Sequence, residues 1–471
     1  MTSSRASARQ AIPDALRRDV RMLGEQLGQV IKDFGGPGLL KDVETLRKSV
    51  IKAREADEFE RRTETIVGSW SLERAEQVAR AFTCYFHLVN LAEEHHRARV
   101  LRERDRDPEP VPESLAATVA DLRRKVGRPR LMEILGCLEV HPVFTAHPTE
   151  ARRRAVVTAI RRVGEQLDRF DDPKSSQSER RESMRRLTEE IDSLWRTGQL
   201  RTSHVTPLDE VRSMTAVFDE TLFRVVPEIY RGLDWALGPS DSGMRPALAP
   251  AFLRFGSWVG GDRDGNDSVT ARITAETILI QAEHVLLALE AATTRTGRAL
   301  TADAATTPPD ADLRRRLDAL RATDPARWAE VEKRSPSEHH RQFLLHVADR
   351  LRVTRRGEPG SRYKSPAELI SDLRSVQGSL AAAGAPRQAY GELQHLVWQA
   401  ETFGFHLAEL EVRQHSRIHS EALAEVRSHR KLSASAREVV DTLGVVASVQ
   451  ARFGPEACRR YVVSFTRDVG D

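Results

Sequence analysis

Segment 140–154 places a histidine, a carboxylate and three arginines at the end of a short apolar run. It reads VHPVFTAHPTEARRR, in which His147 precedes Pro148 and is followed by Glu150 and Arg152–Arg154. A residue before a proline avoids the helical conformation, so we expect His147 on a turn. A neutral imidazole near several guanidinium groups suits proton transfer on an anionic, phosphorylated substrate. A turn histidine that only hydrogen-bonds a neighbouring backbone group is the alternative.

A second polar segment, Gly260–Asn266, holds three glycines, two aspartates and an arginine in the sequence GGDRDGN. It lacks the GxxxxGK[ST] order of a phosphate-binding loop. It is not an EF-hand, because Ile273 occupies the position where a bidentate glutamate is required. Two interpretations stay open. The segment is a tight strand-to-helix turn braced by an Asp–Arg pair, or it is an active-site rim with positive charge from Arg263 and an apolar wall from Trp258.

The third candidate is Arg413, which lies in the sequence GFHLAELEVRQHS at 404–416. Apolar and charged residues alternate there, which is typical of a strand. An arginine at a strand end can bind a carboxylate or a phosphate through two parallel hydrogen bonds. A simple ion pair with Glu409 or Glu411 is the alternative.

Four short apolar segments are the predicted strands, and long helical stretches separate them: Leu138–Thr145, Phe252–Val259, Phe405–Val412 and Tyr461–Phe465. A strand followed by a helical crossover and another strand is typical of a parallel sheet or barrel. In such folds the chemistry lies at the carboxyl ends of the strands. This rule gathers six polar residues on one face: His147, Asp262, Arg263, Asp264, Arg413 and Arg467.

The rest of the chain favours helices. Charged residues make up 30% of the sequence and aromatic residues 6%, a balance typical of helix-rich proteins. Apolar residues recur every three or four positions between Leu16 and Phe34, and a Gly-Gly-Pro sequence ends this helix. Another helix is expected to begin with Ser365 as N-cap, Pro366 as first residue and Glu368 completing a capping box. We expect a mostly α-helical protein.

Charge and cysteine usage exclude several classes of protein. The net charge is only +4, from 73 basic and 69 acidic residues, which argues against nucleic-acid binding. Three distant cysteines, Cys84, Cys137 and Cys458, form no CxxC pair. They argue against a zinc site or a disulfide framework and fit a reducing cytoplasm. No apolar run of about 18 residues is present for a membrane span. We expect a soluble, cytoplasmic protein without a membrane partner.

Three blocks resemble, in order, the signatures of the bacterial phosphoenolpyruvate carboxylase family. They are TAHPTE followed by Arg153–Arg154, then FGSWVGGDRDGN, then FGFHLAELEVRQ. FTCYFHLVNLAEEHHRARVLR, LWRTGQLRTSHVTPLDE and LGEQLGQVI are similar as well, so the resemblance covers nearly the whole chain. It implies a helix-rich protein around a small, TIM-like parallel β/α barrel. Residues 1–136 would be an N-terminal helical region, and 137–471 would be the first half of the barrel with long helical insertions.

The resemblance implies a carbon–carbon lyase that fixes carbon dioxide. With Mg²⁺ or Mn²⁺, the family converts phosphoenolpyruvate and bicarbonate into oxaloacetate and phosphate, which replenishes the tricarboxylic acid cycle. By resemblance, His147 is the catalytic histidine, which takes the proton of carboxyphosphate. Arg413 matches the phosphate-binding arginine, and Trp258 matches a residue of the apolar pocket that keeps carbon dioxide from water. Arg263 matches the arginine of the glycine-rich block, a further substrate-binding candidate.

The departure from the family is at the end of the chain. Family members continue past TRDVGD with the metal-binding carboxylates and an essential lysine. We therefore expect no metal ligands within the chain, metal-binding residues beyond residue 471, half a barrel and poor solubility alone. The expected partner is the missing C-terminal half or further copies, because the family is usually tetrameric. The alternative to this partial enzyme is a non-catalytic remnant or association subunit of the same family.

Overall fold

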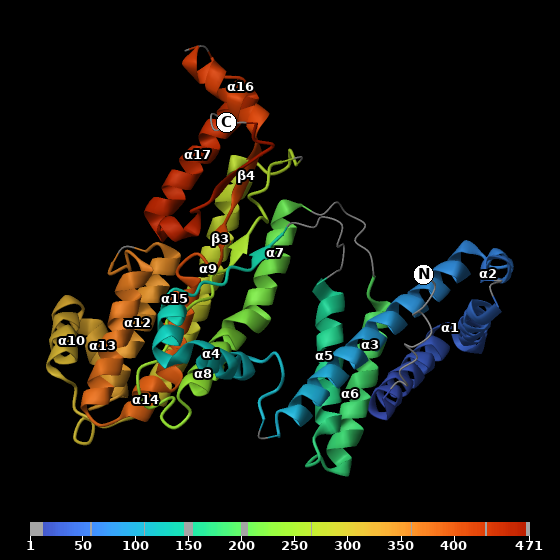
Figure 1. Ribbon diagram of the computed structural model, residues 1–471, viewed down its shortest axis with the longest axis horizontal. Coiled ribbons are helices and arrows are strands. Elements are labelled where there is room, and N and C mark those ends of the chain that lie inside the picture. The colour runs from blue at the N-terminus through green and yellow to red at the C-terminus, as the bar shows by residue number, and fades with distance from the viewer. Residues whose placement is uncertain are drawn as a thin grey trace. The chain divides into compact units, whose positions relative to one another are not determined.

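The computed structural model of the chain describes residues 13–56, 59–107, 109–145, 154–198, 206–264, 266–358, 360–428 and 431–467. Long helices make up most of it, and strands are few and short (Figure 1). The predicted mostly α-helical fold class is therefore confirmed. The strands of the described residues form two small parallel sheets and no closed barrel, so the TIM-like barrel is not confirmed.

The chain divides into two compact units. Unit 1 comprises residues 1–111 and 150–204, and unit 2 comprises residues 112–149 and 205–471. The domain boundary predicted between residues 136 and 137 stays a prediction. None of the described helices is long and apolar enough to cross a bilayer.

Unit 1 is built from helices alone: α1 (Asp14–Ala56), α2 (Phe59–Gly68), α3 (Leu72–Arg104), α5 (Arg154–Asp171) and α6 (Gln177–Arg196). Helix α1 packs against α3 and α6, and α5 packs against α3 and α6. The break predicted after Phe34 is confirmed, because Gly36 has φ 74° and interrupts α1. A left-handed residue of this kind favours glycine. Apolar side chains of α1, α3, α5 and α6 form one core.

Unit 2 contains the remaining helices: α4 (Leu115–Gly136), α7 (Pro207–Val217), the π-helix η1 (Phe218–Leu222), α8 (Phe223–Leu237), α9 (Ala271–Ala299), α10 (Ala311–Thr323), α11 (Pro325–Arg334), α12 (His339–Arg356), α13 (Pro366–Ala382), α14 (Pro386–Tyr390), α15 (Glu392–Phe403), α16 (Ser416–Arg427), α17 (Ala434–Phe453) and the 3₁₀ turn η2 (Pro455–Ala457). Helix α9 packs against α7, α12, α15 and α17. Their apolar faces and the strands share one continuous core.

Helix α13 tests one predicted start. It begins at Pro366 as expected, with Ser365 before it. The capping box is wrong, because the Glu368 carboxylate accepts from the Lys364 N–H at 3.1 Å and Ser365 makes no side-chain cap. The reason is local: the Glu368 N–H is already donated to the Ser365 carbonyl at 3.2 Å.

All four segments predicted as strands contain strands, and the third is split in two: β1 (Val143–Phe144), β2 (Gly256–Ser257), β3 (Glu409–Leu410), β4 (Val412–His415) and β5 (Tyr461–Ser464). Strands β1, β2 and β3 pair in parallel, with Val143 opposite Gly256 and Gly256 opposite Glu409. Strand β4 pairs in parallel with β5. The strand predicted over 405–412 begins later and reaches further than expected.

The two sheets are continuous through Glu411. Its N–H donates to the Ser257 carbonyl at 2.9 Å, and the Arg413 N–H donates to the Gly261 carbonyl at 3.0 Å. The chain of β3 and β4 therefore follows β2 and the glycine-rich loop behind it. The four predicted strands lie side by side in sequence order, and helices connect them, as a β/α arrangement requires.

Candidate functional site

The residues predicted for the site are only partly described by the structure. His147 lies outside the described residues, as do Glu150, Arg152 and Arg153. The last residue of β1 is Phe144, whose carbonyl accepts a hydrogen bond from the Trp258 N–H at 2.8 Å. The chain that leads to His147 therefore leaves the sheet next to the chain that carries Trp258.

Trp258 and Arg413 lie in contact, a pairing that the predicted strand order did not single out. The Arg413 guanidinium carbon lies 4.7 Å from the centroid of the Trp258 ring. Trp258 directly follows β2 and Arg413 lies in β4, so neighbouring parallel strands position the pair. A guanidinium over an indole ring is attracted by the ring quadrupole, which orients both side chains.

Asp262 holds the Arg413 guanidinium in place. Arg413 donates from Nε to Oδ1 and from Nη2 to Oδ2 of Asp262, both at 2.8 Å. This pair raises the pKa of Arg413. The alternative pairing with Glu409 or Glu411 is wrong. An Asp–Arg pair does brace the glycine-rich turn, but the arginine comes from β4. A guanidinium has five N–H donors, so donors of Arg413 remain for an anionic ligand.

Glu411 is a buried residue of the site that the sequence did not single out. Its carboxylate accepts from the Trp258 indole N–H at 2.7 Å, and its other oxygen lies 3.2 Å from His141 Nε2. Gly256 makes room for this contact, because a Cβ there would lie 2.5 Å from His141 Nε2. The sequence did contain the signal. Side chains two apart along a strand share a face, which groups Glu411 with Arg413.

Glu409 continues the same charged face. It is 4% exposed, and its carboxylate accepts from Arg460 and, at 3.4 Å, from Arg459. The Arg460 guanidinium also lies 3.2 Å from His141 Nε2. One face of this sheet thus carries two buried carboxylates, Glu409 and Glu411, that are paired with more exposed basic groups. Polar networks of this kind hold their members in fixed positions.

The glycine-rich turn passes very close to its neighbours. Gly260 has φ 82°, and a Cβ there would lie 2.1 Å from Thr277 Oγ1. A Cβ on Gly261 would lie 2.4 Å from the Glu411 carbonyl oxygen. These glycines let the loop reach from β2 to the start of α9 alongside β4. The segment is thus a tight strand-to-helix turn.

The Arg263 N–H donates to the Arg413 carbonyl at 3.0 Å, but the Arg263 side chain points away from the Trp258–Arg413 pair. Its Nη2 donates to Thr274 Oγ1 at 2.6 Å, and its Nη1 donates to the Gly261 carbonyl at 3.4 Å. The side chain lines a cavity that it shares with Gln414 and Tyr461. Because successive strand residues point to opposite faces, Gln414 and Arg413 face opposite ways. Burial lowers the pKa of Arg263. Its substrate-binding role stays a prediction.

Two further residues were expected on the shared face. Asp264 donates its N–H to Asp262 Oδ1 at 3.2 Å and lines the Arg263 cavity. Arg467 donates from Nη2 to Ser420 Oγ at 3.1 Å, beside α16. Arg413 therefore contacts both Asp262 and Trp258. The side chains of Arg263 and Arg467 bond instead to Thr274 and Ser420.

A metal site is not apparent in the described part of the chain. Among those residues, no group of three or more His, Cys, Asp or Glu side chains is placed to hold a metal ion. The carboxylates nearest the site, Asp262 and Glu411, are already paired with Arg413, Trp258 and His141. These residues do not fit a metal centre.

Comparisons with known proteins give one consistent family. A sequence model of phosphoenolpyruvate carboxylase matches residues 16–432. The phosphoenolpyruvate carboxylase of Roseiflexus castenholzii is 33% identical over 97% of this chain and 54% of its own length. That of Aromatoleum aromaticum is 33% identical over 87% of this chain and 46% of its own length. The chain spans about half the length of the curated relatives it matches. It belongs to the phosphoenolpyruvate carboxylase family.

Proposed function

We propose that this chain supplies part of the active site of a phosphoenolpyruvate carboxylase. The reaction joins phosphoenolpyruvate and bicarbonate to give oxaloacetate and phosphate, and it would supply oxaloacetate to the tricarboxylic acid cycle. The observation that carries the proposal is the Trp258–Arg413 pair, formed directly after β2 and within β4, in a chain of this family. Parallel β/α proteins place their chemistry near the carboxyl ends of the strands, and Trp258 lies at that end of β2.

Arg413 would bind the phosphate group of the substrate. The two hydrogen bonds to Asp262 fix the plane of the guanidinium, so less conformational freedom is lost when a ligand binds. The remaining donors can make charge-assisted hydrogen bonds to phosphate oxygens, which are among the stronger polar contacts in proteins. The Arg413 side chain is 26% exposed and therefore accessible to a ligand.

Trp258 would form the apolar wall of the pocket. Its indole N–H is fixed by Glu411 at 2.7 Å, and one face of the ring is covered by Arg413. A rigid apolar surface beside the phosphate-binding arginine can exclude water from a reactive enolate and from carbon dioxide. Glu411 is thus a positioning residue in this proposal.

His147 would be the proton acceptor. The family motif TAHPTE supports this role, as does its position shortly after β1, the neighbour of β2 in the sheet. An imidazole titrates near neutral pH, so it can take the proton of carboxyphosphate and release it afterwards. The substrate-binding role that the family resemblance implies for Arg263 stays a prediction, and no step proposed here depends on it, because its side chain lines a different cavity.

Several family properties are part of the proposal. The parallel strands would be the first half of a TIM-like barrel, formed by residues 137–471 after an N-terminal helical region, 1–136. Mg²⁺ or Mn²⁺ would be held by carboxylates outside this chain and would stabilise the negative charge of the enolate. The complete enzyme would be a cytoplasmic homo-tetramer. The open order β1–β2–β3 among the described strands supports completion by further strands.

The test is oxaloacetate formation, followed through the oxidation of NADH by malate dehydrogenase. The 471-residue chain is assayed alone and mixed with the part of the Roseiflexus castenholzii relative that it does not match, with phosphoenolpyruvate, bicarbonate and Mg²⁺. We expect turnover in the mixture, here called the complemented enzyme, and at least about a 1,000-fold loss with His147→Asn. Equal turnover of the two mixtures would overturn the role of His147. A mixture without turnover would favour the association subunit.

A further inference from the structure

Arg263 carries a buried positive charge, and no described carboxylate of the candidate active site pairs with its guanidinium. Its residue is only 6% exposed, and its Nε has no hydrogen-bond partner. The two bonds that it does form go to neutral groups, the Thr274 hydroxyl and the Gly261 carbonyl. In the described part of the chain, no carboxylate lies within ion-pair distance of its guanidinium. An arginine keeps its charge at every physiological pH.

A buried charge without a counter-ion is costly, so proteins pair such groups or use them to bind ions. Burial is the main cause that lowers the pKa of Arg263, and the Tyr461, Glu438 and Cys458 groups oppose it only by longer-range attraction. The positive charge therefore remains under-compensated within the chain. A small anion in contact with the guanidinium would remove this deficit.

The structure provides a space for such an anion. Arg263 lines a cavity of about 690 Å³, within the range of small-molecule sites. Hydrogen-bonding side chains line it together with the guanidinium: Asn266, Thr270, Gln414, Ser435, Thr442 and Tyr461. Apart from Thr442, whose hydroxyl already donates to the Glu438 carbonyl at 2.7 Å, these groups can donate to the oxygens of an anion. The cavity does not include Trp258 or Arg413 among its lining residues, so it is distinct from the candidate active site.

Three helices begin at the wall of the cavity. The lining residues include Thr270, the N-cap of α9, Arg417 in the first turn of α16, and Ser435 in the first turn of α17. The amino end of a helix carries partial positive charge, which favours phosphate and sulfate. Part of the first-turn N–H groups already donate within the chain, as Ala271 does to Glu438 and Arg417 does to His415, so the dipoles are the main contribution of these helices. Their dipoles add to the charge of Arg263, which is the independent observation that points to an anion.

Three carboxylates also line the cavity, but each is exposed or has another partner, so none forms an ion pair with Arg263. Glu438 accepts a hydrogen bond from the Ala271 N–H at the start of α9. Asp267 is exposed. Asp264 is partly exposed and stabilises the charge of Arg413 by longer-range attraction. Arg417, whose partner is Glu421 at 2.9 Å, adds a second guanidinium to the lining. Of the charged groups in the lining, Arg263 is the buried one.

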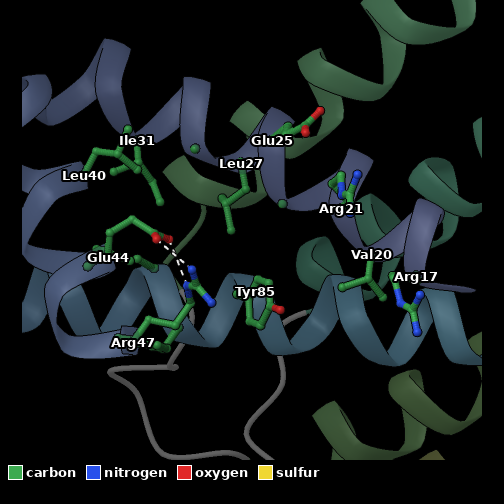
Figure 2. A pocket seen from close by; sticks show the side chains of 15 residues that line it. Arg17, Val20, Arg21, Glu25, Leu27, Ile31, Leu40, Glu44, Arg47 and Tyr85 are labelled. Carbon is green, nitrogen blue, oxygen red and sulfur yellow. Dashed lines mark hydrogen bonds and ion pairs between the residues drawn. The ribbon is translucent and has the colours of Figure 1, made fainter. Parts of the chain in front are cut away.

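A cavity in unit 1 shows the contrast. It has a volume of about 460 Å³ between α1 and α3, and arginines lie around its apolar walls (Figure 2). There, Arg47 donates to both carboxylate oxygens of Glu44, at 3.0 and 2.8 Å. Arg17 pairs with Asp14 at 3.2 Å. Arg47 and Arg17 thus form ion pairs, whereas Arg263 forms none with the described residues.

We propose that the Arg263 cavity binds the phosphate group of a phosphorylated small molecule. The phosphate would take the Nε and Nη donors of Arg263 and lie between the first turns of α9, α16 and α17. The remaining volume would hold the rest of the molecule against Gln414 and Tyr461. This site is separate from the Trp258–Arg413 site, and it does not depend on the proposed carboxylase activity.

The probe is inorganic phosphate, titrated calorimetrically into the 471-residue chain at low salt. The decisive variant is Ser435→Asp, which places a carboxylate in the first turn of α17. It should weaken phosphate binding at least about tenfold, because the new charge occupies the anion position. The same acidic residue favours the helix terminus, so the melting temperature should stay the same or rise.

The matched control is Ser178→Asp, at the same position of α6 in unit 1, where the serine is likewise exposed. It should bind phosphate like the unmodified chain. Arg263→Met should also lose binding, whereas Arg413→Gln should keep it. Absence of phosphate binding would overturn the proposal. So would binding unchanged by Ser435→Asp, or binding lost only in Arg413→Gln, which would place the anion at the other site.

Discussion

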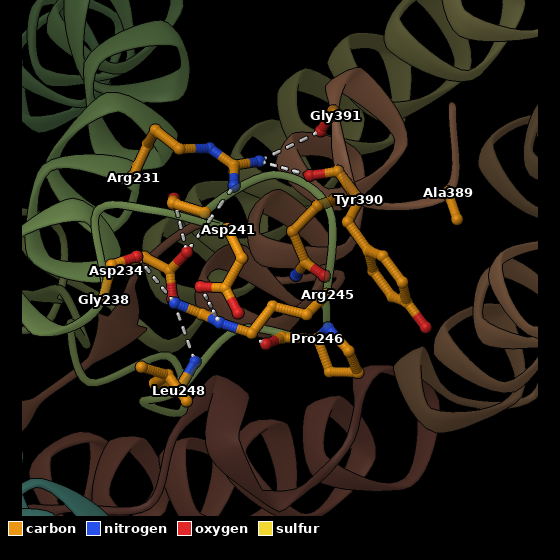
Figure 3. Close-up of polar contacts among 12 residues, drawn as sticks. Arg231, Asp234, Gly238, Asp241, Arg245, Pro246, Leu248, Ala389, Tyr390 and Gly391 are labelled. Carbon is orange, nitrogen blue, oxygen red and sulfur yellow. Dashed lines mark hydrogen bonds and ion pairs between the residues drawn. The ribbon is translucent and has the colours of Figure 1, made fainter. Parts of the chain in front are cut away.

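Unit 2 contains two buried arginines in opposite circumstances. Arg231 on α8 is 8% exposed, and its Nη2 donates to the Tyr390 and Gly391 carbonyls at 2.6 and 3.3 Å. Its guanidinium lies 3.8 Å from the Asp234 carboxylate (Figure 3). It also lies 4.9 Å from the centroid of the Trp398 ring. Arg263 is equally buried, but among the described residues neither a carboxylate within ion-pair distance nor an aromatic ring meets its guanidinium.

The difference separates a structural charge from one that is available for binding. Burial lowers the pKa of both guanidinium groups. Burying a charge costs free energy. Arg231 offsets part of that cost through its hydrogen bonds, which join α8 to the segment between α14 and α15 (Figure 3). Arg263 offsets little of it, because its partners are neutral. The same residue type thus stabilises the fold in one place and creates a site for an anion in the other.

The largest effect is expected for Arg231→Met. The substitution removes hydrogen bonds to the Tyr390 and Gly391 carbonyls and the contact with Trp398. We expect the free energy of unfolding to fall by about 2–4 kcal/mol, because buried acceptors lose a charged donor. Urea unfolding followed by circular dichroism would measure it. A change below about 1 kcal/mol would contradict the structural role of Arg231.

His340 tests how a buried group behaves when it can give up its charge. It is 1% exposed, its Nε2 lies 2.9 Å from Ser379 Oγ, and burial lowers its pKa to about 4. Between about pH 6.5 and pH 4, the His340 imidazole binds a proton in the unfolded chain but stays neutral in the folded chain. Stability is therefore complete above about pH 6.5 and falls by about 1.4 kcal/mol per pH unit down to about pH 4.

The measurement is urea unfolding between pH 7 and pH 4.5 for the unmodified chain and for His340→Gln. The variant should lose less stability on acidification, by about 1.4 kcal/mol for each pH unit. Parallel pH profiles of the two proteins would show that His340 keeps its proton in the folded state. That outcome would mean that His340 stays charged when buried, as Arg263 does, so the contrast between the two residues would disappear.

Arg263→Met should have a small effect on stability in phosphate-free buffer, within about 1 kcal/mol of the unmodified chain. The lost bond to Thr274 is offset by removal of an uncompensated charge, and Thr274 Oγ1 still donates to the Gly260 carbonyl at 2.9 Å. Added phosphate should raise the melting temperature of the unmodified chain only. A loss as large as that of Arg231→Met would make Arg263 a structural residue.

The smallest effect is expected at the unit 1 cavity, where Arg47 pairs with Glu44 and Arg17 pairs with Asp14. Gly28 lies in α1 at the cavity wall, and a Cβ there would meet Leu40 at 3.7 Å, an ordinary contact. Gly28→Ala should raise the free energy of unfolding by about 0.5–1 kcal/mol through helix propensity. Phosphate affinity should stay unchanged in calorimetry. A loss of affinity would assign phosphate binding to unit 1.

The sequence predicted the sheet because its signals are local. Each strand is a short apolar segment between long helical stretches, and all four segments contain strands. The grouping of Asp262 with Arg413 followed from the same logic, since neighbouring parallel strands deliver their ends together, and the structure pairs the two side chains. The extent of each strand was less accurate, as with β4, because pairing with β5 extends it to His415.

The contact of Arg413 with Trp258 and the direction of the Arg263 side chain could not be predicted in this way. Asp262 and Arg413 face one another because Gly260 and Gly261 let the loop approach β4, which is a property of the tertiary register. The same loop turns the neighbouring Arg263 towards α9. Counting residues along a strand assigns faces only while the alternation is regular, and a glycine-rich turn ends it.

The most direct measurement is the Michaelis constant for phosphoenolpyruvate in the complemented enzyme, compared between Arg413→Gln and Arg263→Met. We expect Arg413→Gln to raise this constant about tenfold or more, because it removes a charged contact to the phosphate of the substrate. Arg263→Met should leave it within about twofold, because its cavity lies apart from Trp258 and Arg413. The reverse pattern would place the substrate phosphate on Arg263 and contradict both assignments.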